Sequence, residues 1–93
     1  SRMDQLTNQL LYAALIEARS CERFRLLSNS IPDKALQKFY RKLMISEAHH
    51  YSLFLKFAYQ YGKKKEVNEK WQALLDFEAK LMTQLGKKET IHG

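Results

Sequence analysis

Two residues with chemically useful side chains, Glu47 and His50, stand three positions apart near the middle of the chain. No Gly or Pro occurs from Asp33 to Tyr61, which predicts one long helix over this range. Apolar residues recur along it in steps of three and four, the spacing of one helical face. Glu47 and His50 fall inside that apolar stripe, where a carboxylate and an imidazole are costly unless something compensates them. The pair therefore marks a candidate functional site in the interior.

A third polar residue, Glu17, occupies the apolar stripe of the preceding segment. We expect a helix there from about Asp4 or Thr7 to about Ser28, ended by the turn at Pro32. Glu17 stands about 14 residues before the middle of that turn and Glu47 about 16 after it, so in an antiparallel hairpin their heights differ by roughly 2 Å. The hairpin therefore predicts that Glu17, Glu47 and His50 converge.

The predicted cluster has three possible explanations. Carboxylate oxygens and a neutral imidazole suit iron or manganese, and they also bind zinc. Alternatively, the carboxylates form a buried ion pair or hydrogen-bond network with an Arg. In the third case the two helices pack in a different register from the one predicted, and the three residues lie nearer to solvent. Among the neighbouring residues, Glu78 and Tyr51 are candidates for side chains that contact the ligand residues without binding the metal themselves.

The remaining elements complete an all-α prediction for one domain, residues 1–93. Ser30 followed by Asp33 resembles a capping box for the second helix, and Gly62 is expected to end it. A third helix is expected from about Lys65 to Leu85, ending at Gly86, and residues 87–93 are expected to form a polar tail.

Composition limits the classes of function. The net charge of +6 favours an anionic partner, for which nucleic acid is the common case. The single cysteine fits a reducing compartment, so we expect a cytoplasmic protein. No apolar run approaches twenty residues, which predicts no membrane span.

The ligand count is half of a known arrangement. Ferritin-like dinuclear bundles take one Glu from each of two helices and a Glu-x-x-His pair from each of the other two. This chain has one such set, so the prediction is an antiparallel helical hairpin plus a third helix, half of a ferritin-like four-helix bundle. The other half must come from an N-terminal half outside these residues or from a second copy. Without that other half, the apolar stripes that contain Leu10, Phe24, Leu43, Phe54 and Phe57 should be partly exposed.

The motifs also carry a resemblance. The string Glu-Ala-Arg-Ser-Cys-Glu-Arg-Phe at 17–24, Phe39-Tyr40, and Ser-Glu-Ala-His-His-Tyr at 46–51 resemble the second half of the MiaE-type tRNA hydroxylases. The resemblance covers almost the whole chain and extends through Trp71 to Glu78. The first repeat of that family, with the other Glu and the other Glu-x-x-His, is not among these residues.

The resemblance implies a specific activity. It implies a non-haem di-iron monooxygenase that uses O₂ and an electron donor to hydroxylate the isopentenyl group of 2-methylthio-isopentenyladenosine in tRNA. Glu17, Glu47 and His50 would then be metal ligands. The residues expected to contact tRNA phosphates are Arg19, Arg23, Arg25, Lys63, Lys64 and Lys65. Alternative functions are a non-catalytic helical binding or assembly module, and a ferritin-like protein that stores metal or handles peroxide.

Overall fold

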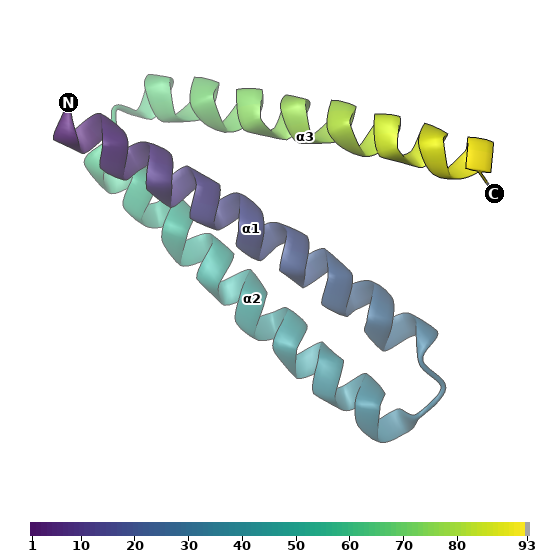
Figure 1. Ribbon diagram of the computed structural model, residues 1–93. Helices are drawn as coiled ribbons and strands as arrows, with labels where there is room; N and C mark the ends of the chain where they lie inside the picture. The colour runs from purple at the N-terminus through teal and green to yellow at the C-terminus, as the bar shows by residue number, and fades with distance from the viewer. Residues whose placement is uncertain (93) are drawn as a thin grey trace.

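The protein consists of three long helices (Figure 1): α1 (Arg2–Ser30), α2 (Lys34–Tyr61) and α3 (Lys64–His92). A computed structural model describes the backbone of residues 1–92 and the side chains of residues 1–86. Helices α1 and α2 form an antiparallel hairpin, and α3 starts beside the open end of that hairpin. The all-α prediction of a hairpin plus a third helix is confirmed. None of the helices, over the residues described, is long and apolar enough to cross a membrane.

The α1–α2 turn is fixed by hydrogen bonds at both helix ends. The Ile31 amide donates to the Leu27 carbonyl at 3.1 Å, and the Asp33 carboxylate accepts from the Leu36 amide at 3.0 Å. Asp33 is therefore the N-cap of α2, and the predicted cap, Ser30, is wrong. Ser30 is instead the last residue of α1, and its hydroxyl donates to the Leu26 carbonyl one turn earlier.

The core lies where all three helices meet, near the chain's first turns. Leu11 of α1, Ala58 of α2 and Val67 of α3 are completely buried, and Leu10, Leu55, Trp71 and Leu74 pack around them. Val67, Trp71 and Leu74 belong to the predicted apolar stripe of the third helix, and the chain packs closely against Val67 and Thr7 at Gly62. This core holds the start of α3 against the hairpin.

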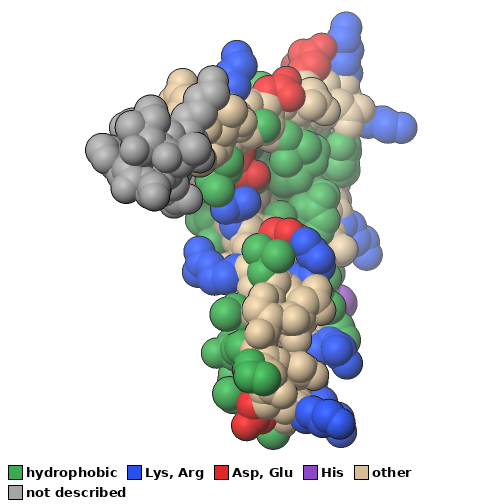
Figure 2. Space-filling model, turned by 90° about the vertical axis from the view of Figure 1, so that its right-hand side faces the viewer, with side chains coloured by type: hydrophobic (Ala, Val, Ile, Leu, Met, Phe, Trp, Pro, Cys, Tyr) green, Lys and Arg blue, Asp and Glu red, His purple; other side chains and the backbone are tan. Residues whose placement is uncertain are grey.

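Beyond this core α3 diverges from the hairpin (Figure 1). Its apolar stripe continues through Phe77, Leu81, Met82 and Leu85, and all four side chains are exposed. The radius of gyration is 16.0 Å, whereas a compact chain of this length has about 12 Å. The accessible surface is 7212 Å², about 1,600 Å² more than a compact monomer of 11.0 kDa has. Hydrophobic side chains accordingly lie open on the hairpin and next to α3 (Figure 2).

Two glycines were expected to end helices, and only one of them does. Gly62 is the C-cap of α2, and its amide donates to the Ala58 carbonyl at 2.9 Å. At Gly86 the prediction is wrong, because α3 continues to His92. A glycine inside a helix costs only about 1 kcal/mol, and no proline follows to stop the helix. The predicted polar tail, 87–93, lies outside the residues whose side chains are described.

Candidate metal centre

The hairpin brings Glu17, Glu47 and His50 together halfway along its length. One ligand atom from each residue lies within 4.8 Å of the others. His50 Nδ1 and Glu17 Oε2 are 3.9 Å apart. Glu17 is on α1, and the other two residues are one helical turn apart on α2. The predicted convergence is therefore found, and it arises because both helices run the same distance from one short turn.

Packing on either side of the cluster fixes the register of the two helices. Toward the turn, the rings of Phe24 and Tyr40 stack with their centroids 6.0 Å apart. The Cys21 thiol donates to the Met44 carbonyl at 3.5 Å, which links α1 to α2 one turn from Glu17. Toward the open end, the buried core begins at Ala14 and Leu11. The three polar side chains thus lie between two layers of well-packed residues.

The carboxylates of the cluster are not paired with a Lys or Arg side chain of the described residues. Among the described residues, no Lys or Arg lies within ion-pair distance of Glu17 or Glu47. The predicted alternative of an ion pair with an Arg is therefore not what the structure shows. Glu17 and Glu47 are partly buried, and two such carboxylates close together repel each other. A cation would remove that repulsion, and His50, 49% exposed, leaves the cluster open on one side.

The donor set fits a transition metal. Carboxylate oxygens and imidazole nitrogens bind zinc or iron at about 2.0–2.2 Å, so two ligand atoms of one ion would span at most about 4.4 Å. The 3.9 Å between His50 and Glu17 falls within that span. The outer limit of 4.8 Å for the cluster exceeds it, so the three side chains would have to rotate slightly to bind one ion together. Three protein ligands leave coordination positions open.

Two predicted neighbours of the cluster connect the hairpin to α3. Arg19 Nε is 3.5 Å from a carboxylate oxygen of Glu78, and another nitrogen of its guanidinium donates to Met82 Sδ at 3.5 Å. Tyr51 lies against Trp71, with ring centroids 5.9 Å apart. Both contacts hold α3 near the level of the cluster. A supporting role for Glu78 and Tyr51 toward the ligands stays a prediction.

The residues predicted to contact RNA differ in whether their charge is already paired with a carboxylate. Arg25 makes two hydrogen bonds to the Glu22 carboxylate, at 2.9 and 2.5 Å. These bonds raise the pKa of Arg25 and lower the pKa of Glu22. Arg19 is held by Glu78. The side chains of Arg23 and of Lys63, Lys64 and Lys65 are exposed and form no ion pair with a described residue.

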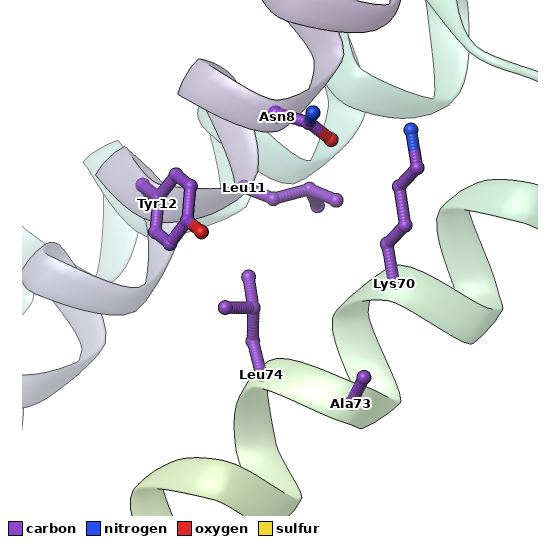
Figure 3. A pocket seen from close by; sticks show the side chains of 6 residues that line it. All are labelled: Asn8, Leu11, Tyr12, Lys70, Ala73 and Leu74. Atoms are coloured by element: carbon purple, nitrogen blue, oxygen red, sulfur yellow. The ribbon is translucent and has the colours of Figure 1, made fainter.

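Sequence reasoning missed a hollow between α1 and α3. It has a volume of about 230 Å³ and lies where α3 begins to diverge (Figure 3). Its lining comes from both helices: Asn8, Leu11, Tyr12, Lys70, Ala73 and Leu74. No local pattern could have found it, because it depends on the angle between the helices. It contains none of the three candidate ligands, so it is separate from the candidate metal centre.

A helical hairpin with a Glu on one helix and Glu-x-x-His on the other matches half of the ligand pattern of ferritin-like dinuclear bundles. Comparison with known sequences identifies the family. The sequence model described as "tRNA-(MS[2]IO[6]A)-hydroxylase (MiaE)" matches residues 2–93, and the chain belongs to this family.

Two curated relatives are each named tRNA 2-(methylsulfanyl)-N(6)-isopentenyladenosine(37) hydroxylase. The protein from Pseudomonas putida is 44% identical over 63 residues, and the one from Salmonella typhimurium is 49% identical over 55 residues. These matches cover 68% and 59% of this chain but only 30% and 20% of the relatives. No solved structure matches the chain. The chain thus spans less than a third of the length of the relatives it matches.

Proposed function

We propose that this chain supplies half of the metal ligands of a non-haem di-iron monooxygenase, which hydroxylates the isopentenyl group of 2-methylthio-isopentenyladenosine in tRNA. The observation that carries the proposal is the convergence of Glu17, Glu47 and His50 within a chain that belongs to the MiaE family. When bound, a di-iron centre supplies the activation of O₂ that attack on an unreactive C–H bond requires. The electrons come from a donor protein or cofactor, and the reaction takes place in the cytoplasm, where the tRNA is.

The chain's own residues have three tasks in this proposal. The carboxylates of Glu17 and Glu47 and the imidazole of His50 hold the metal. Apolar side chains on the same helix faces, among them Phe24 and Phe54, keep water away and leave an environment suited to a prenyl group. Exposed cations, Arg23 and Lys63–Lys65, contact tRNA phosphates; Arg19 and Arg25 first have to exchange Glu78 and Glu22 for a phosphate.

The missing half of the ligand set has to come from elsewhere. The donors required are another Glu and another Glu-x-x-His, which the described residues do not contain as a second cluster. We propose that they are contributed by an N-terminal half of the bundle or, when this chain is alone, by a second copy. A twofold pair would place two identical clusters face to face.

Metal content tests the proposal directly. The variants Glu17→Ala, Glu47→Ala and His50→Ala should each lower the iron bound per chain after anaerobic loading with ferrous iron and desalting. The matched control is His49→Ala, because His49 is an exposed imidazole next to His50 that is not part of the cluster. Circular dichroism should show unchanged helix content in all four.

Two outcomes would contradict the proposal. If the three ligand variants bind as much iron as the parent, the cluster is not a metal centre and the chain is a structural or binding module. If the iron-loaded complete bundle consumes O₂ without hydroxylating the tRNA nucleoside, the function is metal storage or peroxide handling. Nucleoside analysis of tRNA by mass spectrometry distinguishes the second outcome from success.

A further inference from the structure

The outer face of α2 carries cations without acids. Exposed basic side chains recur on it over about 33 Å of helix, and we call them the α2 strip: Lys34, Lys38, Arg41, Lys42 and Lys56. Glu47 is the only acid in this range, and it belongs to the candidate metal centre. None of the five forms an ion pair with a described side chain. Figure 2 shows Lys and Arg side chains along one edge of the hairpin, with a His side chain among them.

This pattern differs from that of an ordinary solvated helix face. Like charges at i, i+4, such as Lys34 with Lys38 and Lys38 with Lys42, destabilise a helix. The other two helices offset their cations with acids: α1 pairs Arg25 with Glu22, and α3 alternates lysines with Glu66, Glu69 and Asp76. The strip therefore concentrates unbalanced charge on one face of one helix.

The arrangement suits a polymer of phosphates better than a small anion. The side chains project outward along a helix axis, with about 6 Å between successive members at i, i+4, so they do not converge on one point. A membrane surface is a poorer match, because a helix that lies in a bilayer inserts its apolar face. Part of the apolar face of α2 packs against α1, and Phe39 and Phe57 on that face stay exposed but lie outside the strip. Ile45 is the one large apolar side chain within the strip.

We infer that the α2 strip is a docking surface for the phosphate backbone of RNA. The inference rests on the proposed function in that tRNA is the RNA expected, and it adds a surface distinct from Arg23 and Lys63–Lys65. The position is suitable as well. Lys42 and His50 are eight residues apart, which places them about 12 Å apart along α2 and about a quarter turn apart around it. A strand bound along the strip therefore passes the open side of the metal centre.

The test compares two triple variants that lose equal charge. Lys34→Gln, Lys38→Gln and Lys42→Gln remove the strip, and Arg2→Gln, Lys70→Gln and Lys80→Gln remove three cations from α1 and α3. Gln and Lys have similar helix propensities, so both proteins should keep their helix content. Affinity for an anticodon stem–loop RNA is measured by fluorescence anisotropy over a series of salt concentrations. Vesicles containing phosphatidylserine serve as the second polyanion.

The inference requires the strip variant to lose about 2–3 units of the slope of log affinity against log salt, since each phosphate contact contributes about 0.7–0.9. The control should keep nearly the parent slope. Equal losses in the two variants, no RNA binding by the parent, or strip-dependent binding to vesicles but not to RNA would each overturn it. Iron content should be unchanged in the strip variant, so failure here is distinguishable from failure of the metal centre.

Discussion

Gly62 determines how closely α3 can approach the hairpin. Its backbone, with φ −108° and ψ 162°, is accessible to any residue, so the reason for glycine is space. A Cβ built at this position would lie 2.6 Å from Val67 Cγ2 and 3.0 Å from Thr7 Cγ2. Ordinary carbon contacts are about 3.5–4.0 Å, and both neighbours are buried. Gly62→Ala therefore has to push α3 away from the hairpin by about 1 Å.

The expected cost follows from two opposing effects. Overpacking a filled core costs about 1–3 kcal/mol, whereas replacing glycine by alanine restricts the unfolded chain and returns about 0.4–1 kcal/mol. The net result should be a loss of about 1–2 kcal/mol, or roughly 5–15 °C in Tm for a chain of this size. Thermal unfolding followed by circular dichroism at one protein concentration measures it.

Gly86→Ala is the matched control, because a Cβ there meets no atom within 4 Å. It lies inside α3, so alanine should stabilise the protein by about 0.5–1 kcal/mol. In a Val67→Ala background the cost of Gly62→Ala should shrink, since the closest contact is gone. If Gly62→Ala behaves like Gly86→Ala, or if its cost is unchanged in that background, the steric explanation is wrong. Iron content should not change, because the candidate ligands are on α1 and α2.

Two further predictions concern assembly and pH. In a solution of this chain alone, light scattering should give about twice the monomer mass, because the excess surface of about 1,600 Å² exceeds the roughly 800 Å² per partner of a standard interface; a cooperatively melting monomer would contradict this. Acid should destabilise α1 near Glu22. Because the pKa of Glu22 is lowered, its ion pair with Arg25 stabilises the helix at pH values above the usual pKa range of Glu. That stabilisation is lost as the pH falls through the lowered pKa. Helix content measured against pH should lose this step in Arg25→Gln, and an identical acid profile would refute it.

Local rules were sufficient to predict the hairpin and the cluster. A long segment without Gly or Pro, one short turn and equal distances from that turn place Glu17 beside Glu47 whatever the rest of the chain does. The cap at the turn was harder, because Ser30 and Asp33 are both good capping residues and only their backbone conformation separates them. At Gly86 the prediction ended the helix at a glycine, although a single glycine disfavours a helix only weakly.

The course of α3 could not be read from its pattern. Its stripe from Val67 to Leu85 has the spacing of a helix that packs along its whole length, but only the first part does so. The spacing of apolar residues indicates which face of a helix will be buried. It does not indicate which element will bury that face. The contact between Arg19 and Glu78, the hollow next to Lys70 and the exposure of Phe77 all depend on the angle between α3 and the hairpin. That angle depends on tertiary packing, including the close approach at Gly62 and the contact between Tyr51 and Trp71.

The open apolar surface and the candidate metal ligands are connected on α2. Phe39, His50 and Phe57 are separated by eleven and seven residues, which are close to three and two helical turns, so they share one row. All three are exposed, at 54%, 49% and 38%. A partner that covers the two phenylalanines must also cover the imidazole between them. Burial of the apolar row and completion of the metal centre are thus expected to be one event, and metal bound in the completed site would stabilise the assembly by mass action.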